Sequence, residues 1–292
     1  MESFDLGVLG ASSPVGDCLL ETLASHPCRV CAFSRRVECD KAGSVAPIWQ
    51  APGMVSLQIP SWICLAPIWV LPDYFDWLLA CGVRRIVVLS STSRFAKHDS
   101  PDVAERCIAE RLAQAEERVE LWARLHRIEW LILRPTLIYG SGRDRNVAFM
   151  MRFVKRWRVF PLAGAGSGLR QPVHVRDVAR ACMQALNSSL DAKTYNLSGA
   201  ECLSFRDMVE RCSAAVGVRP WLPSIPLGIL HTLLWVLALL RPQAGWSPGM
   251  ADRMNRDQDF DHSSATRDFG FCPQPFRPGL PGTPPEKDVF QK

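Results

Sequence analysis

Segments of two kinds alternate along the first two-thirds of the chain. Short apolar runs predict buried strands at residues 6–9, 29–33, 85–91 and 129–134, and residues 61–69 predict a further buried strand followed by a loop at Ala66 and Pro67. Between them lie segments whose apolar side chains recur every three or four residues, as in an amphipathic helix. The longest, residues 101–126, carries such a stripe at Ile108, Leu112, Ala115, Val119 and Trp122. Strands that alternate with helices predict an α/β fold with a Rossmann-type, doubly wound parallel sheet.

The same pattern divides the chain into a large part and a smaller one. Residues 1–198 are expected to form the Rossmann domain, with residues 140–170 contributing in part to a substrate cleft. Residues 199–272 predict a smaller, mainly helical C-terminal region. Residues 273–292 are rich in Pro and Gly and predict an extended tail.

Turn and cap residues mark where several elements begin and end. Residues 72–80 predict a helix that Gly82 stops. Residues 40–60 are rich in Pro, Gly and Ala and show no clear helix, so this part of the βαβ repeat is expected to be trimmed. Asp177 is expected to cap the N-terminus of a helix over residues 178–186.

Residues 226–240 form the most apolar stretch of the chain. A helix that spans a bilayer needs about 20 apolar residues. This stretch is shorter, is flanked by prolines and is interrupted by His231. We therefore expect a buried or groove-lining helix, with contact to a membrane surface or to a partner protein as the alternative.

Charge and cysteine content narrow the class of protein. The formal net charge of +5 is modest for 292 residues and is spread along the chain, so we expect no nucleic-acid site. The 11 cysteines lack the spacing of a disulfide framework or a metal site. The one close pair, Cys28 and Cys31, lies at a predicted strand, where residues three apart face opposite sides. Without a secretory leader, the sequence predicts a reduced, cytoplasmic protein with no bound metal.

A glycine-containing turn joins the first predicted strand to the first helix. Gly10, Ser13 and Gly16 occupy the three positions of a dinucleotide-binding fingerprint, with serine where the middle glycine usually stands. Such a turn lets the backbone approach a pyrophosphate, which the N–H groups at the start of the helix then bind. Glycine also ends strands for purely structural reasons, so the turn indicates a dinucleotide site only in combination with other features.

Polar residues follow two further predicted strands. Arg35 and Arg36 follow the second strand, whose end lies beside the adenosine ribose in such a domain. Guanidinium groups pair with a 2′-phosphate and favour NADP over NAD, although two solvated turn arginines are the other interpretation. Ser90, Ser91 and Thr92 stand at the carboxyl end of the strand at 85–91, where parallel sheets bind ligands.

Five motifs in order carry a resemblance to a known family. They are the turn at 10–16, Leu-Ser-Ser at 89–91, Leu-Arg-Pro-Thr-Leu-Ile-Tyr-Gly at 133–140, Pro-Val-His-Val-Arg-Asp-Val-Ala at 172–179 and Tyr-Asn-Leu-Ser-Gly at 195–199. Together they resemble the atypical extended short-chain dehydrogenases/reductases of the NAD-dependent epimerase/dehydratase family. The resemblance implies that NADP, or alternatively NAD, is bound by Gly10, Ser12, Ser13, Val15, Gly16, Arg35, Arg36, Ala66, Pro67, Ser90, Pro135 and Thr136.

The resemblance also implies a small-molecule substrate, a nucleotide-sugar or a related polar molecule. The residues that would line its cleft are Tyr139, Asn146, Arg170 and Gln171. Arg170 would suit a diphosphate through bidentate pairing, and a surface position at the edge of a glycine-rich loop is the alternative.

The chain departs from the family at the catalytic residues. The family uses a Ser or Thr, for which Ser91 or Thr92 stands here, together with a Tyr and a Lys four residues apart on the long helix. No tyrosine of this chain has a lysine four residues later, and alignment on Glu116 places Ile108 and Leu112 at the two positions. Other acid/base candidates, each of which could equally be a solvated or structural side chain, are Glu105, His98, Lys97 and His174.

Two main hypotheses follow from the sequence. The first is an NAD(P)-dependent epimerase, dehydratase or reductase with a substitute acid/base group. The second is a catalytically silent cofactor-binding subunit, structural or sensing, for which residues 226–240 would be the docking surface. A redox-sensing regulator is a third hypothesis, and the sequence predicts no particular oligomeric state.

Overall fold

The computed structural model describes residues 4–25, 27–34, 48–50, 52, 57–144, 146–240 and 249–279. The chain forms two compact units. The first comprises Met1–Thr136, Val175–Ser198 and Phe260–Pro273, and the second comprises Leu137–His174, Gly199–Asp259 and Gln274–Lys292.

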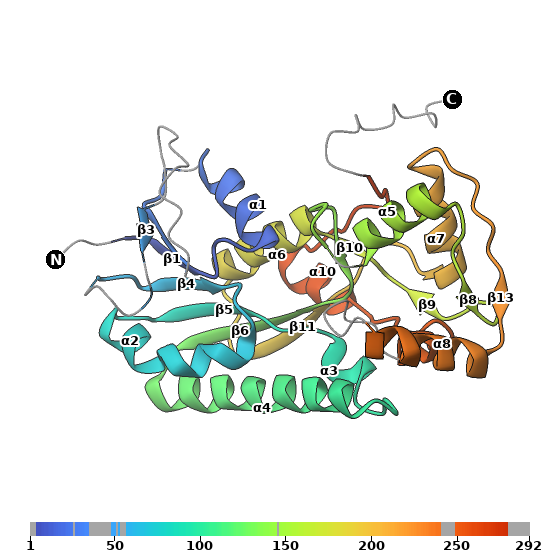
Figure 1. The fold of residues 1–292 in the computed structure, drawn as a ribbon. Helices are drawn as coiled ribbons and strands as arrows, with labels where there is room; N and C mark the ends of the chain where they lie inside the picture. The colour runs from blue at the N-terminus through green and yellow to red at the C-terminus, as the bar shows by residue number, and fades with distance from the viewer. Residues whose placement is uncertain are drawn as a thin grey trace. The chain divides into compact units, whose positions relative to one another are not determined.

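A seven-stranded sheet forms the centre of the first unit (Figure 1). Its order is β11 (Lys193–Leu197), β6 (Glu129–Pro135), β5 (Arg85–Leu89), β4 (Ser61–Cys64), β1 (Leu6–Leu9), β2 (Val30–Phe33) and β3 (Ile48–Gln50). Every neighbouring pair is parallel. The predicted Rossmann-type sheet is confirmed, and β3 lies in the segment 40–60, most of which is outside the described residues.

Helices cover both faces of this sheet (Figure 1). One face carries α1 (Pro14–Leu23) and α6 (Val175–Asn187), and the other carries α2 (Phe75–Ala80) and the long α4 (Val103–His126). The predicted apolar stripe of α4 is confirmed, because Leu112, Ala115 and Val119 are buried and Ile108 packs against the same core. The short elements of this unit are η1 (Ile68–Tyr74), α3 (Ser93–Ala96) and α10 (Ser263–Phe269).

The second unit has its own apolar core between α5 (Val147–Trp157) and α7 (Phe205–Ala214). Its remaining helices are α8 (Leu227–Leu240) and α9 (Gly249–Arg253). Three strand pairs complete it: β7 (Ile138–Tyr139) with β10 (Val173–His174), β9 (Leu169–Arg170) with β12 (Leu203–Ser204), and β8 (Leu162–Ala163) with β13 (Ser224–Ile225).

Three local predictions are wrong in detail. The helix predicted at 72–80 is the 3₁₀ helix η1 followed by α2, because Pro72 lies inside the first and cannot donate an α-helical hydrogen bond. Asp177 does not cap a helix: α6 already begins at Val175, and Asp177 is buried in its first turn and paired with Arg180. Cys28 precedes β2 rather than lying in it.

The prediction that residues 226–240 form a buried or groove-lining helix is also wrong. They form α8 as a helix, but Leu230 is buried while Ile229, Trp235 and Leu239 are 62%, 60% and 70% exposed. Among the described helices, none combines the length and the apolarity needed to cross a bilayer. In the same described part of the chain, no three His, Cys, Asp or Glu side chains come together as metal ligands would.

Candidate functional site

The turn between β1 and α1 lies at the carboxyl edge of the sheet, where the strand order reverses. The chain leaves β1 toward β2 on one side, while β4 pairs with β1 on the other. Gly10 has φ +81°, and a Cβ there would lie 2.4 Å from the backbone nitrogen of Ala66, just after β4. The two backbones therefore meet at the switch point of the sheet, which is where dinucleotides bind in doubly wound folds.

Only glycine fits at the start of α1 as well. A Cβ on Gly16 would lie 2.2 Å from the carbonyl oxygen of Ala11. Ser13 is the N-cap of α1, and its hydroxyl accepts a hydrogen bond from the Gly16 N–H at 3.1 Å. The first helical residue is Pro14, which has no N–H. The start of α1 can therefore bind an anion, but two of its backbone amides do not contribute. The Gly16 N–H is bonded to the Ser13 hydroxyl, and Pro14 has no N–H.

The other predicted cofactor residues gather along the same edge. The Ser12 and Ser34 hydroxyls are 2.8 Å apart, which ties the β1–α1 turn to the end of β2. Ala66 and Pro67 follow β4, Ser90 follows β5, and Pro135 ends β6. The Thr136 hydroxyl donates to the Leu197 carbonyl at the end of β11, 3.4 Å away. Val15 is buried in α1, whereas Arg35 and Arg36 lie outside the described residues.

A buried ionic cluster lies behind this edge. The carboxylate of Glu116 on α4 has no exposed surface. It accepts hydrogen bonds from Arg134 Nε at 3.0 Å and Nη2 at 2.6 Å, from the Ser90 hydroxyl at 2.5 Å, and from Arg94. Burial alone would raise the pKa of Glu116, but the hydrogen bonds of Arg134 and Ser90 and the two positive charges outweigh it and hold the pKa below its usual value.

Glu116 therefore joins the ends of β5 and β6 to the long helix. In the sequence, Glu116 lies close to the two positions aligned with the catalytic Tyr and Lys. Its hydrogen-bond donors come from three other segments: Ser90 follows β5, Arg94 lies in α3 and Arg134 lies in β6. Ser90 is one of these partners, so its hydroxyl serves this cluster.

The two hydroxyls predicted as catalytic have different surroundings. Ser91 is partly exposed, and its oxygen accepts a hydrogen bond from the Ser93 N–H at 3.1 Å. Thr92 is 5% exposed and donates to the Pro135 carbonyl at 3.3 Å. Both lie at the carboxyl end of β5, as the sequence predicted.

On α4, the positions aligned with the family's Tyr and Lys are apolar and packed. Leu112 is 3% exposed, and Ile108 packs against the sheet core. One turn before Ile108 on the same helix face lies Glu105, which is also buried. Its carboxylate accepts from the Ser100 hydroxyl at 2.8 Å and lies 3.9 Å from the ammonium of Lys97.

The remaining acid/base candidates have other surroundings. The His98 side chain is 73% exposed and lies 2.8 Å from the Asp99 carboxylate. In the second unit, the His174 ring meets the Tyr139 ring edge-on, with 5.1 Å between centroids.

Among the predicted substrate residues, two are engaged within the second unit. Tyr139 is 1% exposed; its hydroxyl donates to the Pro275 carbonyl and accepts from the Arg277 N–H at 3.1 Å. Arg170 is 4% exposed and donates to the carbonyls of residues 169, 253 and 256. Burial lowers the pKa of Arg170 to about 10, with the Asp257 charge opposing it. This geometry does not support the diphosphate contact predicted for Arg170.

The other two predicted substrate residues are more accessible. Asn146 stands at the start of α5 with its side chain exposed, and Gln171 between β9 and β10 is partly exposed.

A histidine that the sequence did not single out lies at the carboxyl end of β11. Ser198, which has no exposed surface, donates from its hydroxyl to the Phe260 carbonyl at 2.6 Å, and its oxygen is 2.6 Å from His262 Nδ1. The ring of His262 packs edge-on against Phe271. Ser198 and His262 are 64 residues apart, so no local pattern in the sequence could have paired them.

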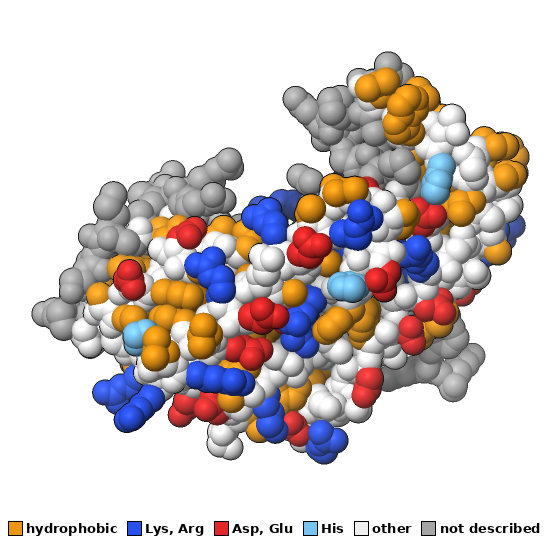
Figure 2. Space-filling view, turned by 90° about the horizontal axis from the view of Figure 1, so that it is seen from below, with side chains coloured by type: hydrophobic (Ala, Val, Ile, Leu, Met, Phe, Trp, Pro, Cys, Tyr) orange, Lys and Arg blue, Asp and Glu red, His pale blue; other side chains and the backbone are white. Residues whose placement is uncertain are grey.

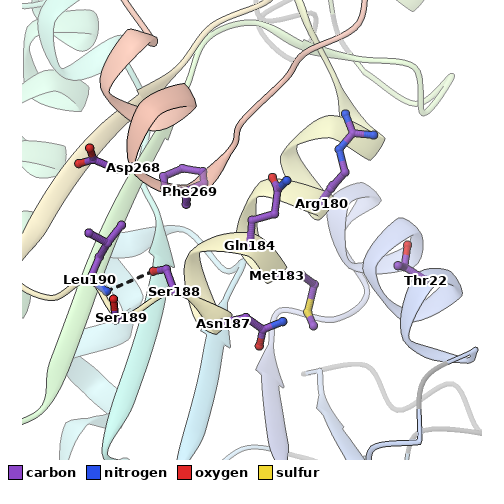
Figure 3. A pocket seen from close by; sticks show the side chains of 10 residues that line it. All are labelled: Thr22, Arg180, Met183, Gln184, Asn187, Ser188, Ser189, Leu190, Asp268 and Phe269. Carbon is purple, nitrogen blue, oxygen red and sulfur yellow. Dashed lines mark hydrogen bonds between the residues drawn. The ribbon is translucent and has the colours of Figure 1, made fainter.

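A cavity of about 580 Å³ lies elsewhere on the first unit (Figure 3). It is lined by the second half of α6, the turn that follows it, the C-terminal turn of α1 and the end of α10, including Thr22, Gln184 and Phe269. None of the residues predicted for the cofactor or the substrate lines it.

Comparison with known proteins gives one family match. The model of the NAD dependent epimerase/dehydratase family matches residues 73–198. A 2-alkyl-3-oxoalkanoate reductase of Stenotrophomonas maltophilia is 28% identical over 173 residues, which cover 56% of this chain and 52% of that protein. NADH dehydrogenase [ubiquinone] 1 alpha subcomplex subunit 9 of Arabidopsis thaliana is 37% identical over 84 residues, which cover 28% of this chain and 21% of that protein.

The chain spans about half the length of the curated relatives it matches, and less of the Arabidopsis protein. Among solved structures, MoeE5 in complex with UDP-glucuronic acid and NAD is similar over 93% of this chain and 94% of that one. The TM-score is 0.68 and the sequence identity 20%, so this likeness establishes the fold.

Proposed function

Because this chain belongs to the NAD-dependent epimerase/dehydratase family, we propose that it binds NAD(P) in its first unit and acts as an epimerase, dehydratase or reductase. The proposed substrate is a nucleotide-sugar or a related polar molecule. Support for this substrate class comes from MoeE5, whose solved complex holds UDP-glucuronic acid and NAD.

One observation carries the proposal: the two glycines at the switch point have no room for a side chain. The backbone atoms that a Cβ at Gly10 or Gly16 would meet belong to the segment after β4 and to the turn itself. A turn held this tightly at the start of a helix fits a diphosphate better than it fits a purely structural connection.

The residues of the β1–α1 turn and of the end of β2 fit a bound dinucleotide, and each would have a different role in binding it. The N–H of Val15 belongs to the first turn of α1, whose amides have no intrahelical acceptor, and it would donate to the diphosphate. Ser12 and Ser34 hold the turn against β2. Bound NAD(P) would supply the hydride acceptor or donor of the reaction. We propose NADP over NAD on the strength of Arg35 and Arg36 in the sequence.

We further propose that the usual Tyr and Lys are absent and that Glu105 takes over the acid/base role. Ile108 and Leu112 cannot carry a proton. Glu105 lies one turn before Ile108, is buried, and is oriented by Ser100 and Lys97. A carboxylate held between a hydroxyl and an ammonium can take a proton from a substrate hydroxyl and return it. Thr92 would then orient that hydroxyl.

A catalytically silent cofactor-binding subunit is the second candidate function. The packed apolar pair Ile108 and Leu112 favours it, and so does the match to the NADH dehydrogenase subunit. We also propose a reducing, cytoplasmic location, because all the cysteines that the structure describes are free.

Cofactor binding is tested by titrating the purified chain with NADPH and NADH and following nicotinamide fluorescence. We expect saturable binding, and we expect Gly16→Val to reduce the affinity at least tenfold, because the added side chain would clash with the Ala11 carbonyl. Gly228→Val is the control, since nothing lies within 4 Å of a Cβ at that helical position. Equal affinity of all three proteins would contradict the proposed site.

Catalysis is tested with a panel of UDP- and dTDP-sugars, followed by cofactor absorbance and by product analysis. If the chain is an enzyme, Glu105→Gln should abolish turnover while NADPH still binds. Glu110→Gln is the matched control, because Glu110 is exposed on the same helix. Cofactor binding without turnover of any substrate in the panel would favour the silent subunit, and turnover that Glu105→Gln leaves intact would exclude Glu105 as the acid/base group.

A further inference from the structure

The cavity on the first unit follows one side of α6 (Figure 3). Its lining residues on this helix recur every three or four positions and so share one helix face; they are Arg180, Met183, Gln184 and Asn187. The last turn of α1 and the end of α10 lie at its sides, and the turn after α6 lies at one end. All of these segments belong to the first unit, so the cavity is formed by that unit alone.

The size of the cavity limits what it can hold. Its volume of about 580 Å³ lies within the range of about 300–1,000 Å³ that is typical of small-molecule sites. Along α6, the lining residues from 180 to 187 span about 10 Å. This space is too large for a single ion and too small for a folded partner, and it suits an organic molecule of two linked rings.

Three helices direct their C-terminal ends toward this space. Thr22 stands in the last turn of α1, Asn187 is the last residue of α6, and Phe269 is the last residue of α10. The C-terminal end of a helix carries a partial negative charge, because its last carbonyl groups have no intrahelical donor. The cavity therefore disfavours anions such as phosphate and favours groups that donate hydrogen bonds.

The charged side chains at the wall already have partners of opposite charge. Arg180 donates to the carboxylate of Asp177 one turn earlier on α6. Asp268 accepts the Tyr195 hydroxyl at 2.7 Å and lies 3.3 Å from Lys193 Nζ. Because both charges are compensated within the protein, the wall favours an uncharged ligand.

The amide of Gln184 is a polar group of the wall whose hydrogen bonding is incomplete. Its Nε2 donates to the Gly270 carbonyl at 3.2 Å, which fixes the orientation of the amide. Its Oε1 is buried and accepts no hydrogen bond from the described part of the chain. A buried acceptor without a donor is unfavourable, so Gln184 selects a ligand that brings an N–H or O–H group to this oxygen.

The groups around Gln184 match the faces and the edge of a planar heterocycle. Met183 has an unbranched, adaptable side chain, and the partly exposed ring of Phe269 is held edge-on against Tyr195 with 5.1 Å between centroids. Asn187, three residues after Gln184, has an exposed amide that offers both donors and an acceptor. Glutamine and asparagine amides pair with the amino group and the ring nitrogen of adenine in this way.

Hydroxyl groups complete the wall at two other places. Thr22 on α1 and Ser189 in the turn after α6 are both exposed and line the cavity. A hydroxyl can donate and accept, so these two side chains match the hydroxyls of a sugar ring.

We propose that this cavity binds a nucleoside whose base carries an exocyclic amino group. The amino group donates to Gln184 Oε1, the Asn187 amide donates to a ring nitrogen, and the ribose lies toward the hydroxyls of the wall. This inference does not depend on the proposed function, because none of the residues assigned to the cofactor or the substrate lines the cavity.

The full-length chain is titrated with adenosine by calorimetry, in the presence of excess NADPH so that the proposed cofactor site is occupied. We expect saturable binding of one adenosine per chain. AMP should bind no more tightly than adenosine, since its phosphate would meet the negative ends of the helices. Inosine, which has a carbonyl in place of the amino group, should bind at least tenfold more weakly, because its oxygen would face the Gln184 oxygen.

Gln184→Met removes the amide and keeps the length of the side chain. We expect this variant to bind adenosine at least tenfold more weakly and to lose the preference for adenosine over inosine. The matched control is Gln114→Met, which changes an exposed glutamine of α4 and should bind adenosine like the unchanged chain. Helix α4 covers the other face of the sheet, and Figure 2 views the molecule from that side, where charges of both signs alternate.

Ser189→Trp is a second variant, which acts through space rather than through a hydrogen bond. Ser189 is exposed at the cavity, so an indole there would occupy part of its volume and should lower adenosine affinity at least tenfold. Circular dichroism of each variant checks that the chain is folded.

Four outcomes would overturn the proposal. They are the absence of saturable adenosine binding, displacement of adenosine by NADPH, AMP binding at least tenfold tighter than adenosine, and equal effects of Gln184→Met and Gln114→Met. Adenosine binding by a chain that does not bind NADPH would support the proposal and would contradict the cofactor site alone.

Discussion

Replacing Glu116 with glutamine should destabilise the first unit strongly while changing a single functional group. The carboxylate is fully buried and accepts hydrogen bonds from two guanidinium groups and one hydroxyl. The side-chain amide of the glutamine has no charge, and its NH₂ group would face the N–H donors of Arg94 or Arg134 in place of an acceptor. The side chains of these two arginines are only 25% and 12% exposed. Removing one partner of a buried ion pair costs about 3–5 kcal/mol, because the remaining charge stays desolvated without compensation.

The assay is chemical unfolding followed by circular dichroism at neutral pH, with Glu117→Gln as the control. Glu117 is the next residue of α4 and is exposed, so its replacement should change the free energy of unfolding by no more than about 0.5 kcal/mol. A cost for Glu116→Gln below about 1 kcal/mol, or equal to that of the control, would refute the reasoning.

The pH dependence gives an independent check. The pKa of Glu116 in the folded chain lies below its usual value of 4.5. The carboxylate therefore contributes stability that is complete above that usual value and is lost as the pH falls through the lower, folded-state pKa. The difference in stability between the unchanged chain and Glu116→Gln should thus shrink on acidification below about pH 4.5. A difference that stays constant down to pH 3 would contradict the assignment of the charge.

Three further predictions concern the cofactor site and the second unit. Changing Arg35 and Arg36 to aspartate should lower the ratio of NADPH affinity to NADH affinity at least tenfold by titration, and an unchanged ratio would remove their proposed role. Ser13→Gly frees the Gly16 N–H from its cap and should tighten NADPH binding several-fold by calorimetry; weaker binding would mean that the hydroxyl itself contacts the phosphate. Arg170→Met leaves buried carbonyl groups without donors and should lower the free energy of unfolding by about 2–3 kcal/mol, whereas an effect near zero would show that those carbonyls find other partners.

The fold could be predicted well from the sequence because its signals are local. Five strands of the sheet, β1, β2, β4, β5 and β6, coincide with short apolar runs, and the apolar stripe of α4 has helical spacing. The two edge strands have weaker signals: β11 reads Lys-Thr-Tyr-Asn-Leu, and β3 has only three residues. The Asp177 prediction failed because residue type alone indicates a cap, whereas the chain enters α6 directly from β10 and so begins the helix two residues earlier.

Long-range partners were harder to predict than elements. The sequence placed Glu116 near the catalytic positions, but its partners lie 18 to 26 residues away on other elements. The pairing of Ser198 with His262 spans a still longer separation. The prediction that residues 226–240 are buried was wrong because an apolar sequence indicates only that a helix favours apolar surroundings. It does not indicate whether the rest of the same chain provides those surroundings.

The order in which the chain contributes to its two units has a consequence for biosynthesis. The first unit takes its last piece from Phe260–Pro273, after the chain has passed through most of the second unit. In that last piece, Asp268 accepts the hydroxyl of Tyr195 on β11, so the edge strand of the sheet receives its side-chain partner late. A nascent chain that has left the ribosome only as far as β11 cannot yet complete this unit. Truncation before residue 260 should therefore yield aggregation-prone fragments rather than an autonomous nucleotide-binding domain.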